Sequence, residues 1–248
     1  MKISAIVSTY NSECFLASRL DNLLNQTVAE WLEIIVVNSG SEEREREIVR
    51  RYQADHKDRI IYVETERENL YQSWNRAIRL CRGQYITNAN TDDRLCFDAL
   101  ELLSNALDRD AGIGLVYGDS YSTATVSDII EFNGTFERRD GWTHVTQPDY
   151  SHKNLLLSCL CGPHPMWRRA FHDSHGLFDT QYVVAGDYEF WLRIAEDTKF
   201  LHLDQSLGLV YENPNGIENR NRRLLFDENK QLRLLYFGKA RDTEASRK

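Results

Sequence analysis

Short apolar runs alternate with helical segments through the first half of the chain, and this alternation limits the fold more than any other feature of the sequence. Residues 34–37 are all β-branched and stand between polar residues, which is typical of a strand buried on both faces of a parallel sheet. Helical stripes separate the runs, and the clearest has its apolar residues between Leu70 and Cys81. The strand-like runs occupy residues 3–8, 34–37, 60–63, 85–89 and 113–117. This order predicts an α/β fold with a mostly parallel, doubly wound sheet.

The second half of the chain has a different texture. Residues 121–136 alternate and are rich in Thr, Ser and β-branched side chains, so we expect antiparallel strands beside the main sheet. A long helix over residues 219–237 mixes arginines with leucines, and the polar tail after Gly238 is expected to fray. Further helices are predicted over 152–158 and 187–196, and a strand over 207–211. No linker, repeat or low-complexity segment divides the 248 residues, which predicts a single compact domain.

Composition excludes several classes of protein. The formal net charge of −8 argues against a general nucleic-acid binder, which would carry a basic face. The longest apolar runs are far too short to span a bilayer, and Met1 leads straight into a strand rather than a signal peptide. Five cysteines form an odd set, and Cys159 and Cys161 are closer together than in the usual zinc pattern, so reduced thiols are expected. We therefore expect a soluble, cytoplasmic protein with no nucleic-acid partner.

Several polar residues have the spacing of helix caps. Ser39 and Glu42 fit a capping box for the helix after the second strand, and Gly83 stands where the helix before the fourth strand would end. The acidic turn at residues 92–94 has the composition of an N-terminal cap for a helix beginning near Phe97.

Polar turns follow three of the predicted strands. Thr9, Tyr10 and Asn11 follow the first strand, Asn38 follows the second, and residues 90–93 follow the fourth. Open α/β sheets bind ligands at the carboxyl ends of their strands. Closely spaced carboxylates repel one another unless a cation compensates, and a divalent ion that holds a diphosphate is a common compensation. The pattern therefore indicates a metal-bound nucleotide at this edge, while helix capping stays open as the alternative role of these residues.

Asp187 stands at the start of an amphipathic helix, directly after Gly186. The helix dipole favours the ionised form of a carboxyl group in this position, as a general base at neutral pH requires. On spacing alone, an N-cap aspartate in front of an aromatic core face is the preferred interpretation.

Taken together, these stretches resemble an inverting family 2 glycosyltransferase with the GT-A fold. Residues 6–11 are similar to the family's first strand with its Thr-Tyr-Asn turn, and residues 33–41 to its second strand with a Gly-Ser turn. Residues 71–78 resemble the central helix, which leads to a turn at residues 90–93 that is similar to the D-x-D metal motif. Residues 186–193 resemble the acidic motif on the acceptor side. The likeness spans most of the chain in the family's order.

The resemblance implies roles for residues of the donor site. Asp92 would ligate Mg²⁺ or Mn²⁺ between the diphosphate oxygens, with Asn90 facing the donor ribose or a water on the ion. Thr9 and Tyr10 would line the nucleotide pocket, and Asn38 would meet the base. The donor-binding residues that it implies are Thr9, Tyr10, Asn11, Asn38, Asn90 and Asp92.

The resemblance also implies the reaction and the partners. Asp187 would take the proton from the acceptor hydroxyl while the metal stabilises the leaving diphosphate, so the anomeric configuration would invert. The implied donor is a nucleotide sugar, with a UDP-sugar favoured, and the implied acceptor is a saccharide or a lipid-linked molecule. Synthesis of a cell-surface polysaccharide or glycolipid would be the setting.

Three positions depart from the family pattern. The family commonly has Asp where this chain has Asn38 and Asn90, and it often has Glu at the position of Gly186. Each departure removes a charge from the base contact, the metal site or the acceptor motif. Glu189 is the carboxylate left to compensate on the acceptor side. A catalytically silent module that binds nucleotide sugars is therefore the alternative function.

The family pattern divides the single domain into parts. Residues 1–118 would form a Rossmann-like nucleotide-sugar-binding half, residues 119–215 an antiparallel acceptor-side half, and residues 216–248 a C-terminal helix and tail. That helix is expected to pack across the domain. Its arginines and leucines suit the alternative of peripheral contact with the inner face of a membrane, near a lipid-linked acceptor.

Overall fold

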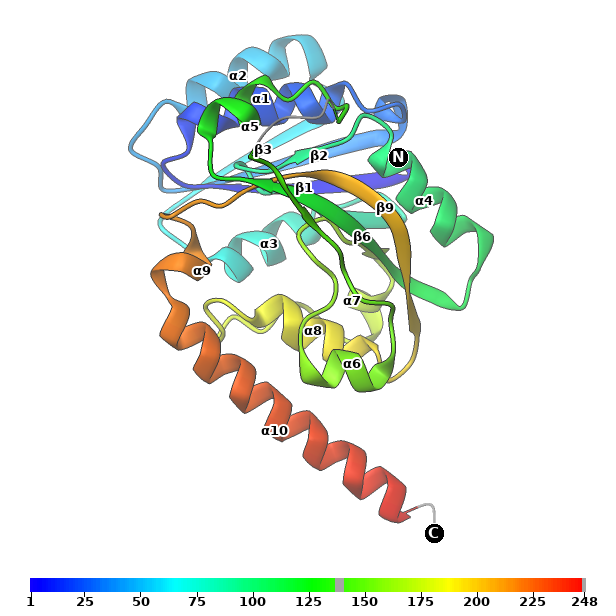
Figure 1. The fold of residues 1–248 in the computed structure, drawn as a ribbon. Helices are drawn as coiled ribbons and strands as arrows, with labels where there is room; N and C mark the ends of the chain where they lie inside the picture. Colours follow the sequence, from blue (N-terminus) through cyan, green and yellow to red (C-terminus); the bar gives the residue numbers. More distant parts are fainter. Residues whose placement is uncertain (137–140, 247–248) are drawn as a thin grey trace.

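A single mixed sheet forms the centre of the computed structural model, which describes residues 1–136 and 141–246 (Figure 1). Within these residues the sheet has nine strands in the order β3-β2-β1-β4-β8-β6-β9-β5, with β7 paired to β6. The strands of the first half are β1 (Ile3–Thr9), β2 (Leu32–Ser39), β3 (Ile60–Thr65) and β4 (Tyr85–Asn88). They run parallel to one another, as the alternation of strands and helices predicts.

The second half of the chain extends the sheet. β8 (Met166–Arg168) lies antiparallel between β4 and β6 (Ile113–Thr123), and β9 (Lys199–Tyr211) runs parallel to β6. The short strands β5 (Arg94–Leu95) and β7 (Thr143–Val145) pair antiparallel with β9 and β6. The predicted fold class, a mostly parallel sheet with an antiparallel extension, is therefore confirmed.

Helices cover both faces of the sheet, and Figure 1 shows α1, α2 and α5 on one side and α3, α6 and α8 on the other. Successive side chains of β1 serve two cores: Ala5 and Val7 pack with α1 and α4, whereas Ile6 packs with α3 and α8. The helices between the strands are α1 (Glu13–Leu24), the 3₁₀ turn η1 (Ala29–Trp31), α2 (Glu45–His56), α3 (Leu70–Ile78), α4 (Ala99–Arg109), α5 (Val126–Glu131), α6 (His152–Leu157), α7 (Phe171–Ser174) and α8 (Gly186–Ile194).

Residues 121–136 do not form the predicted antiparallel strands beyond the end of β6. β6 continues only to Thr123, and residues 126–131 turn into α5. Ile129 of this helix is fully buried in the core shared with α1, and Asp128 accepts a hydrogen bond from the Thr123 hydroxyl at 2.8 Å. Burial of one apolar side chain and a local hydrogen bond therefore prevail over the strand-like composition.

Two predicted helix caps are wrong. Ser39 is the last residue of β2, and its hydroxyl accepts the backbone N–H of Glu68 at 2.6 Å, while α2 begins only at Glu45. Gly83 lies beyond the end of α3, which stops at Ile78, and a Cβ atom there would come within 2.7 Å of the Ser4 backbone nitrogen. The glycine is required by close approach to β1 and not by a helix end.

The chain ends in two helices, α9 (Ile217–Arg220) and α10 (Arg222–Ser246). α10 continues through Gly238, so the predicted frayed tail is helical as far as Ser246. One face of α10 buries Leu232 and Tyr236 against α6 and α8, which confirms the predicted packing across the domain. Along residues 1–136 and 141–246, no helix combines the length and the apolar character that a membrane span needs.

Candidate active site

The polar turns that follow the first strands meet at one edge of the sheet. Thr9 at the end of β1 is paired in register with Asn38 of β2, which is paired in turn with Glu64 of β3. The backbone N–H of Ala89, directly after β4, donates to the carbonyl of Ile6 at 2.9 Å. The structure therefore brings together the turns that carry Tyr10, Asn38 and Asp92, as the parallel order predicts.

Asn11 joins the turns after β1 and β2. Its backbone has a φ of 48°, in the left-handed region that Asn tolerates better than most residues. Its N–H donates to the Ser41 hydroxyl at 3.1 Å, and its Oδ1 accepts the N–H of Glu42 at 3.0 Å. Ser12, not Asn11, precedes α1 as the N-cap residue, so helix capping by Asn11 is wrong.

Thr9 and Tyr10 face different environments. Thr9 is 1% exposed, and its hydroxyl is buried without a hydrogen-bond partner among the described residues. The Tyr10 ring is 41% exposed, and the guanidinium group of Arg67 lies 3.7 Å from its centroid. Tyr10 is therefore the accessible member of this pair, and Arg67 is a residue at this edge of the sheet that the sequence pattern missed.

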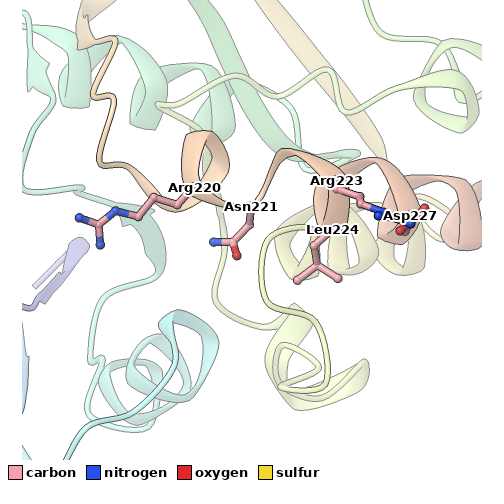
Figure 2. A pocket seen from close by; sticks show the side chains of 5 residues that line it. All are labelled: Arg220, Asn221, Arg223, Leu224 and Asp227. Carbon is pink, nitrogen blue, oxygen red and sulfur yellow. The ribbon is translucent and has the colours of Figure 1, made fainter.

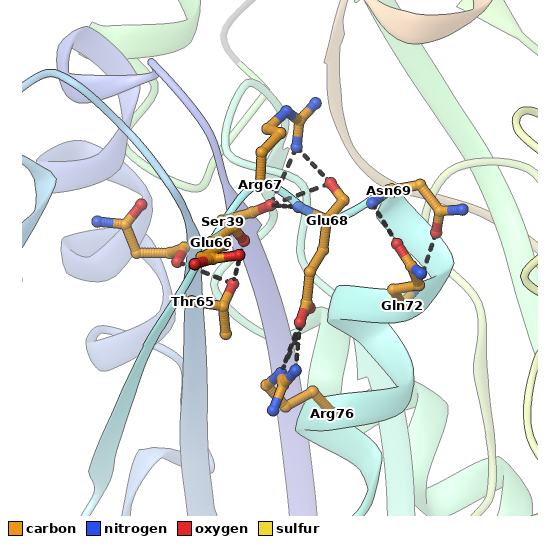
Figure 3. A network of polar contacts seen from close by, with 9 residues as sticks. Ser39, Thr65, Glu66, Arg67, Glu68, Asn69, Gln72 and Arg76 are labelled. Carbon is orange, nitrogen blue, oxygen red and sulfur yellow. Dashed lines mark hydrogen bonds and ion pairs between the residues drawn. The ribbon is translucent and has the colours of Figure 1, made fainter.

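The loop that carries Arg67 is held against β2 by a polar network (Figure 3). The Ser39 hydroxyl receives hydrogen bonds from Arg67 Nη1 at 3.0 Å and from the Glu68 N–H. Asn69 and Gln72 form a reciprocal capping box that starts α3. The position of Arg67 is thus fixed from both ends of its loop.

The Asn38 side chain uses both of its polar atoms inside the protein. Its Nδ2 donates to the Tyr62 hydroxyl at 2.9 Å, and its Oδ1 accepts the Ser41 N–H at 3.0 Å. The residue is 2% exposed. An amide satisfies both a donor and an acceptor at this position, which a carboxylate cannot do.

Two acidic residues of the predicted metal turn have separate environments. Asp92 accepts a hydrogen bond on Oδ2 from Asn213 Nδ2 at 2.8 Å, and among the described residues no hydrogen bond reaches its Oδ1. Asp93 is buried and accepts from Asn90 Nδ2 at 3.0 Å and from the Tyr211 N–H at 3.3 Å. Burial, and then the charge of Asp92, raise the pKa of Asp93 to about 7. Asp98 is the N-cap residue of α4, so the capping interpretation of the acidic turn is wrong.

Two buried arginines donate hydrogen bonds to backbone carbonyls of this turn. Arg94 Nη1 donates to the carbonyls of Thr91 at 2.8 Å and Asp93 at 2.6 Å, and Arg19 Nη1 donates to the same Asp93 carbonyl at 3.1 Å. Burial lowers the pKa of Arg19 to about 9 and that of Arg94 to about 10. The positive charges of Arg19 and Arg94 balance the negative charges of Asp92 and Asp93 and so stabilise the acidic turn.

Asp187 lies in the first turn of α8, one residue inside the helix. Its Oδ1 accepts the Tyr188 N–H at 2.8 Å and the Tyr71 hydroxyl at 3.2 Å. Ala185 occupies the N-cap position, so the N-cap interpretation of Asp187 is wrong. Burial raises the pKa of the Asp187 carboxyl to about 6, and the charge of Glu218 adds to this shift.

The segment after β9 runs from the acidic turn toward Asp187. Asn213 contacts Asp92, and five residues later the charge of Glu218, in α9, acts on Asp187. The sequence reasoning missed Asn213, although the Asn-Pro-Asn-Gly turn directly after a strand is the kind of signal that located the other polar turns.

A pocket of about 330 Å³ opens where α9 meets α10 (Figure 2). Figure 2 shows Arg220 at one end of it and Arg223 with Asp227 at the other. Its lining residues are Arg220, Asn221, Arg223, Leu224 and Asp227. This pocket includes none of the residues predicted from the sequence, and it adjoins the segment that passes between Asp92 and Asp187.

Comparison with known proteins assigns the chain to a family. The model of the family described as "Glycosyl transferase family 2" matches residues 4–162, which include the turns after β1 and β2 and the acidic turn. The chain belongs to glycosyl transferase family 2. The resemblance to this family that the sequence shows is therefore confirmed.

Curated relatives of this family 2 chain include enzymes of polysaccharide synthesis. The chondroitin synthase of Escherichia coli is 27% identical over 204 residues, which are 82% of this chain and 28% of that protein. The hyaluronan synthase of Pasteurella multocida is 26% identical over 204 residues, or 82% of this chain and 20% of that protein. The chain thus spans between a fifth and a third of the length of these relatives.

Solved structures of glycosyltransferases share the fold. Residues 1–349 of S. aureus TarS in complex with UDP superpose with a TM-score of 0.69 at 20% identity, covering 95% of this chain and 65% of that one. The mannosyltransferase PcManGT from Pyrobaculum calidifontis, in complex with GDP-Man and Mn²⁺, gives a TM-score of 0.65 at 21% identity and covers 96% and 64%. These likenesses confirm the GT-A fold.

The acidic turn of this family 2 member suits a metal ion that arrives with its substrate. The described residues include no group of three or more His, Cys, Asp or Glu side chains that could hold an ion alone. Asp92 offers one carboxylate oxygen without a hydrogen bond, and the Asn90 amide oxygen beside it is neutral. Mg²⁺ and similar ions are commonly held by one or two carboxylates together with substrate phosphates, so the residues fit such an ion.

The structure explains the glycine at position 186. A Cβ atom there would lie 2.7 Å from Cε2 of Tyr71, so the aromatic ring fills the space that a larger residue would need. Glu189 does not replace the missing carboxylate at the site. It is 8% exposed and binds Arg193 of the same helix and the Tyr236 hydroxyl of α10, the latter at 3.0 Å.

Proposed function

We propose that the chain transfers a sugar from a UDP-sugar to a hydroxyl group of a saccharide or lipid-linked acceptor, with inversion, in the synthesis of a cell-surface polysaccharide or glycolipid. The whole chain would act as one GT-A domain, with residues 1–118 binding the donor, residues 119–215 facing the acceptor and residues 216–248 as the C-terminal helix and tail. The observation that carries the proposal is the loop between Asn213 and Glu218, which links the acidic turn to Asp187. The names of the polysaccharide synthases and the UDP complex of TarS support the acceptor class and the nucleotide.

The donor would bind at the edge formed by β1, β2 and the acidic turn. Tyr10 offers an exposed ring for the base, and Asn11 and Asn38 shape the pocket beside it. Thr9 would support the pocket from its buried position. Asn90 would face the donor ribose or a water on the ion.

Asp92 would hold Mg²⁺ or Mn²⁺ through its carboxylate. When bound, the ion would supply positive charge that stabilises the leaving diphosphate, which would lower the barrier to breaking the bond between the anomeric carbon and the diphosphate oxygen. Asn213 holds one Asp92 oxygen through its hydrogen bond, so the other oxygen would be left to bind the ion.

Asp187 would act as the general base. Its Oδ1 is occupied by Tyr188 and Tyr71, which leaves Oδ2 to accept the proton of the acceptor hydroxyl. A pKa of about 6 keeps the carboxylate ionised at neutral pH while making it a stronger base than an ordinary aspartate.

A panel of UDP- and GDP-sugars would test the proposal by release of the nucleoside diphosphate in the presence of Mn²⁺. We expect one UDP-sugar to support turnover and to raise the melting temperature. Asp92→Ala should abolish the Mn²⁺-dependent part of nucleotide binding, and Asp187→Asn should abolish turnover while nucleotide binding persists. Wild-type turnover in both variants would refute the assignment of these residues.

Peripheral contact with the cytoplasmic face of a membrane is the arrangement we propose for α10. The side of the helix that faces away from the domain carries Phe226 and Leu234, which are 63% and 68% exposed, together with Arg223 and Lys230. Apolar and basic residues on one helix face favour binding to anionic lipid. In a flotation assay, the wild-type protein should rise with anionic vesicles. The double variant Phe226→Ser, Leu234→Ser should stay at the bottom of the gradient. A wild-type protein that also stays at the bottom would refute the contact.

A further inference from the structure

A carboxylate from the C-terminal helix is buried against the segment that precedes Asp187. Glu228 of α10 is 7% exposed. Its two oxygens accept three consecutive backbone N–H groups, from Val183 at 2.8 Å, from Val184 at 3.0 Å and from Ala185 at 2.8 Å. α10 packs on α8 here, so the contact joins the last helix of the chain to the start of the helix that carries Asp187.

The same segment is held from its other side by α3. The single proton of the Tyr71 hydroxyl is shared between the Val184 carbonyl at 2.6 Å and Oδ1 of Asp187 at 3.2 Å. The N–H groups of residues 183–185 thus donate to Glu228, and the Val184 carbonyl accepts from Tyr71. Gly186 packs closely against the Tyr71 ring. The backbone leading into Asp187 has little freedom while both contacts are present.

The charge of Glu228 makes this contact strong. Hydrogen bonds from N–H groups to a carboxylate are roughly twice as strong as those between neutral groups. Loss of the carboxylate would leave three N–H groups without their acceptor in a largely buried place, which is costly. The chain would relieve this cost by moving residues 183–185 toward water, and Asp187 would move with them.

We propose that Glu228 is a positioning residue for Asp187, through which α10 fixes the general base of the reaction. The proposal rests on the function assigned to Asp187 above. It gives the C-terminal helix a part in catalysis although its residues lie outside the segment matched by the family. Among residues 1–136 and 141–246, the hydrogen bonds of the Glu228 carboxylate all go to residues 183–185 and none to the donor edge, so nucleotide binding should not depend on it.

Glu228→Gln tests the proposal, because the amide keeps the shape of the side chain but retains only one acceptor oxygen. We expect amide hydrogen exchange in residues 183–188 to become at least about tenfold faster, with exchange in β1 and β2 unchanged. Turnover would be measured with the UDP-sugar and Mn²⁺, and with water or an added acceptor as the second substrate. The kcat should fall by about 10- to 100-fold, because small displacements of a reacting group have effects of this size. The affinity for UDP with Mn²⁺ should stay at the wild-type value.

Asp227→Asn is the matched control, because it removes a carboxylate from the adjacent, exposed position of α10. It should leave both the exchange of residues 183–188 and kcat unchanged. A purely structural role for Glu228 would lower UDP affinity and kcat together, and that result would overturn the proposal. Unchanged exchange in Glu228→Gln would overturn it as well.

A double variant separates this proposal from the function on which it rests. Asp187→Glu keeps a carboxylate base in a shifted position and so serves as the background; if Glu228 acts through Asp187, Glu228→Gln should cause a much smaller loss of kcat there than in the wild type. Additive losses would overturn the positioning role. If Asp187→Asn itself keeps wild-type turnover, the proposed base is wrong, while the exchange measurement still decides whether Glu228 holds residues 183–188.

Discussion

The amide of Asn213 donates a hydrogen bond to Oδ2 of Asp92 across 2.8 Å and joins the loop after the last strand to the acidic turn after the fourth. Asn213 is itself held, since its Oδ1 accepts the Asn215 N–H at 2.9 Å and its carbonyl accepts Asn219 Nδ2 at 2.7 Å. A rigid donor of this kind fixes which carboxylate oxygen of Asp92 remains for a ligand. The contact therefore connects the donor edge with the loop that leads to α9.

Removal of either partner should weaken metal-dependent binding to different degrees. Asp92→Asn should abolish the gain in UDP affinity that Mn²⁺ provides, because the ion loses its carboxylate. Asn213→Ala should reduce that gain about tenfold, since a hydrogen bond to a charged group contributes ~1.5–3 kcal/mol. Titration calorimetry of UDP with and without Mn²⁺ would measure both, and uridine is the control ligand because it carries no phosphate. Equal Mn²⁺ dependence in wild type and Asp92→Asn would contradict the metal site.

Tyr10→Ala should weaken binding of the base rather than of the diphosphate. The ring is 41% exposed and has Arg67 on it at 3.7 Å, so a base that stacks there would join an existing cation–π contact. Loss of an aromatic stacking partner costs about 1–3 kcal/mol per base. Affinity for uridine and for UDP should therefore fall by the same factor, roughly tenfold or more. A loss confined to UDP would show that Tyr10 contacts the phosphates instead.

Patterns within a few residues were enough to predict the sheet and the edge at which its polar turns meet. The β-branched run in β2 and the apolar stripe of α3 each report burial locally, and parallel strands place Tyr10, Asn38 and Asp92 at one edge. The contacts that complete the site are of another kind. Asn213 and Asp92 are 121 positions apart, and Tyr71 and Asp187 are 116 apart. No periodicity records which side chains meet across such distances.

Local capping signals failed where a tertiary contact competed for the same group. Ser39 has the spacing of an N-cap residue, but its hydroxyl binds the Glu68 N–H and Arg67 across the sheet edge. Asp93 looks like a cap in sequence, yet it is buried beneath the turn with the Tyr211 N–H on its carboxylate. In both cases a donor from a segment distant in the sequence binds the side-chain oxygen, so this oxygen does not cap a helix.

The activity should fall on the acid side of about pH 6. Burial raises the pKa of Asp187 to about 6, so protonation below that pH removes the base and turnover should drop about tenfold per pH unit. Rates of nucleoside diphosphate release across the acid range would show this limb. UDP–Mn²⁺ affinity over the same range is the control. Asp93, in the acidic turn, has a pKa of about 7, so any effect of its protonation on metal-dependent binding would be measured separately. A rate that stays flat through pH 6 would exclude Asp187 as the base.

Asp187→Asn should be inactive but more stable than the wild type at alkaline pH. The folded-state pKa of Asp187 lies above the ordinary value of 3.8, so the protonated form suits the folded protein and its stabilising contribution is lost as the pH rises through about 6. Asparagine stays neutral, and the difference in melting temperature should therefore appear above pH 6 and vanish near pH 4. Each ~1 kcal/mol corresponds to about 2–4 °C in a protein of this size. Melting curves at acid and alkaline pH would measure it, and a constant difference would contradict the ionisation argument.

Gly186→Ala should destabilise the protein because the added methyl group meets the Tyr71 ring. The new Cβ atom would lie 2.7 Å from Cε2 of Tyr71, and overpacking of this kind costs about 1–3 kcal/mol. Gly238→Ala is the matched control, since its Cβ atom would have no neighbour within 4 Å and alanine favours a helix. Combining Gly186→Ala with Tyr71→Leu should recover part of the stability without recovering turnover, because the hydroxyl that binds Asp187 is then gone. Urea unfolding and turnover measured on the same variants would separate the two effects, and a Gly186→Ala protein that unfolds at the wild-type urea concentration would disprove the steric account.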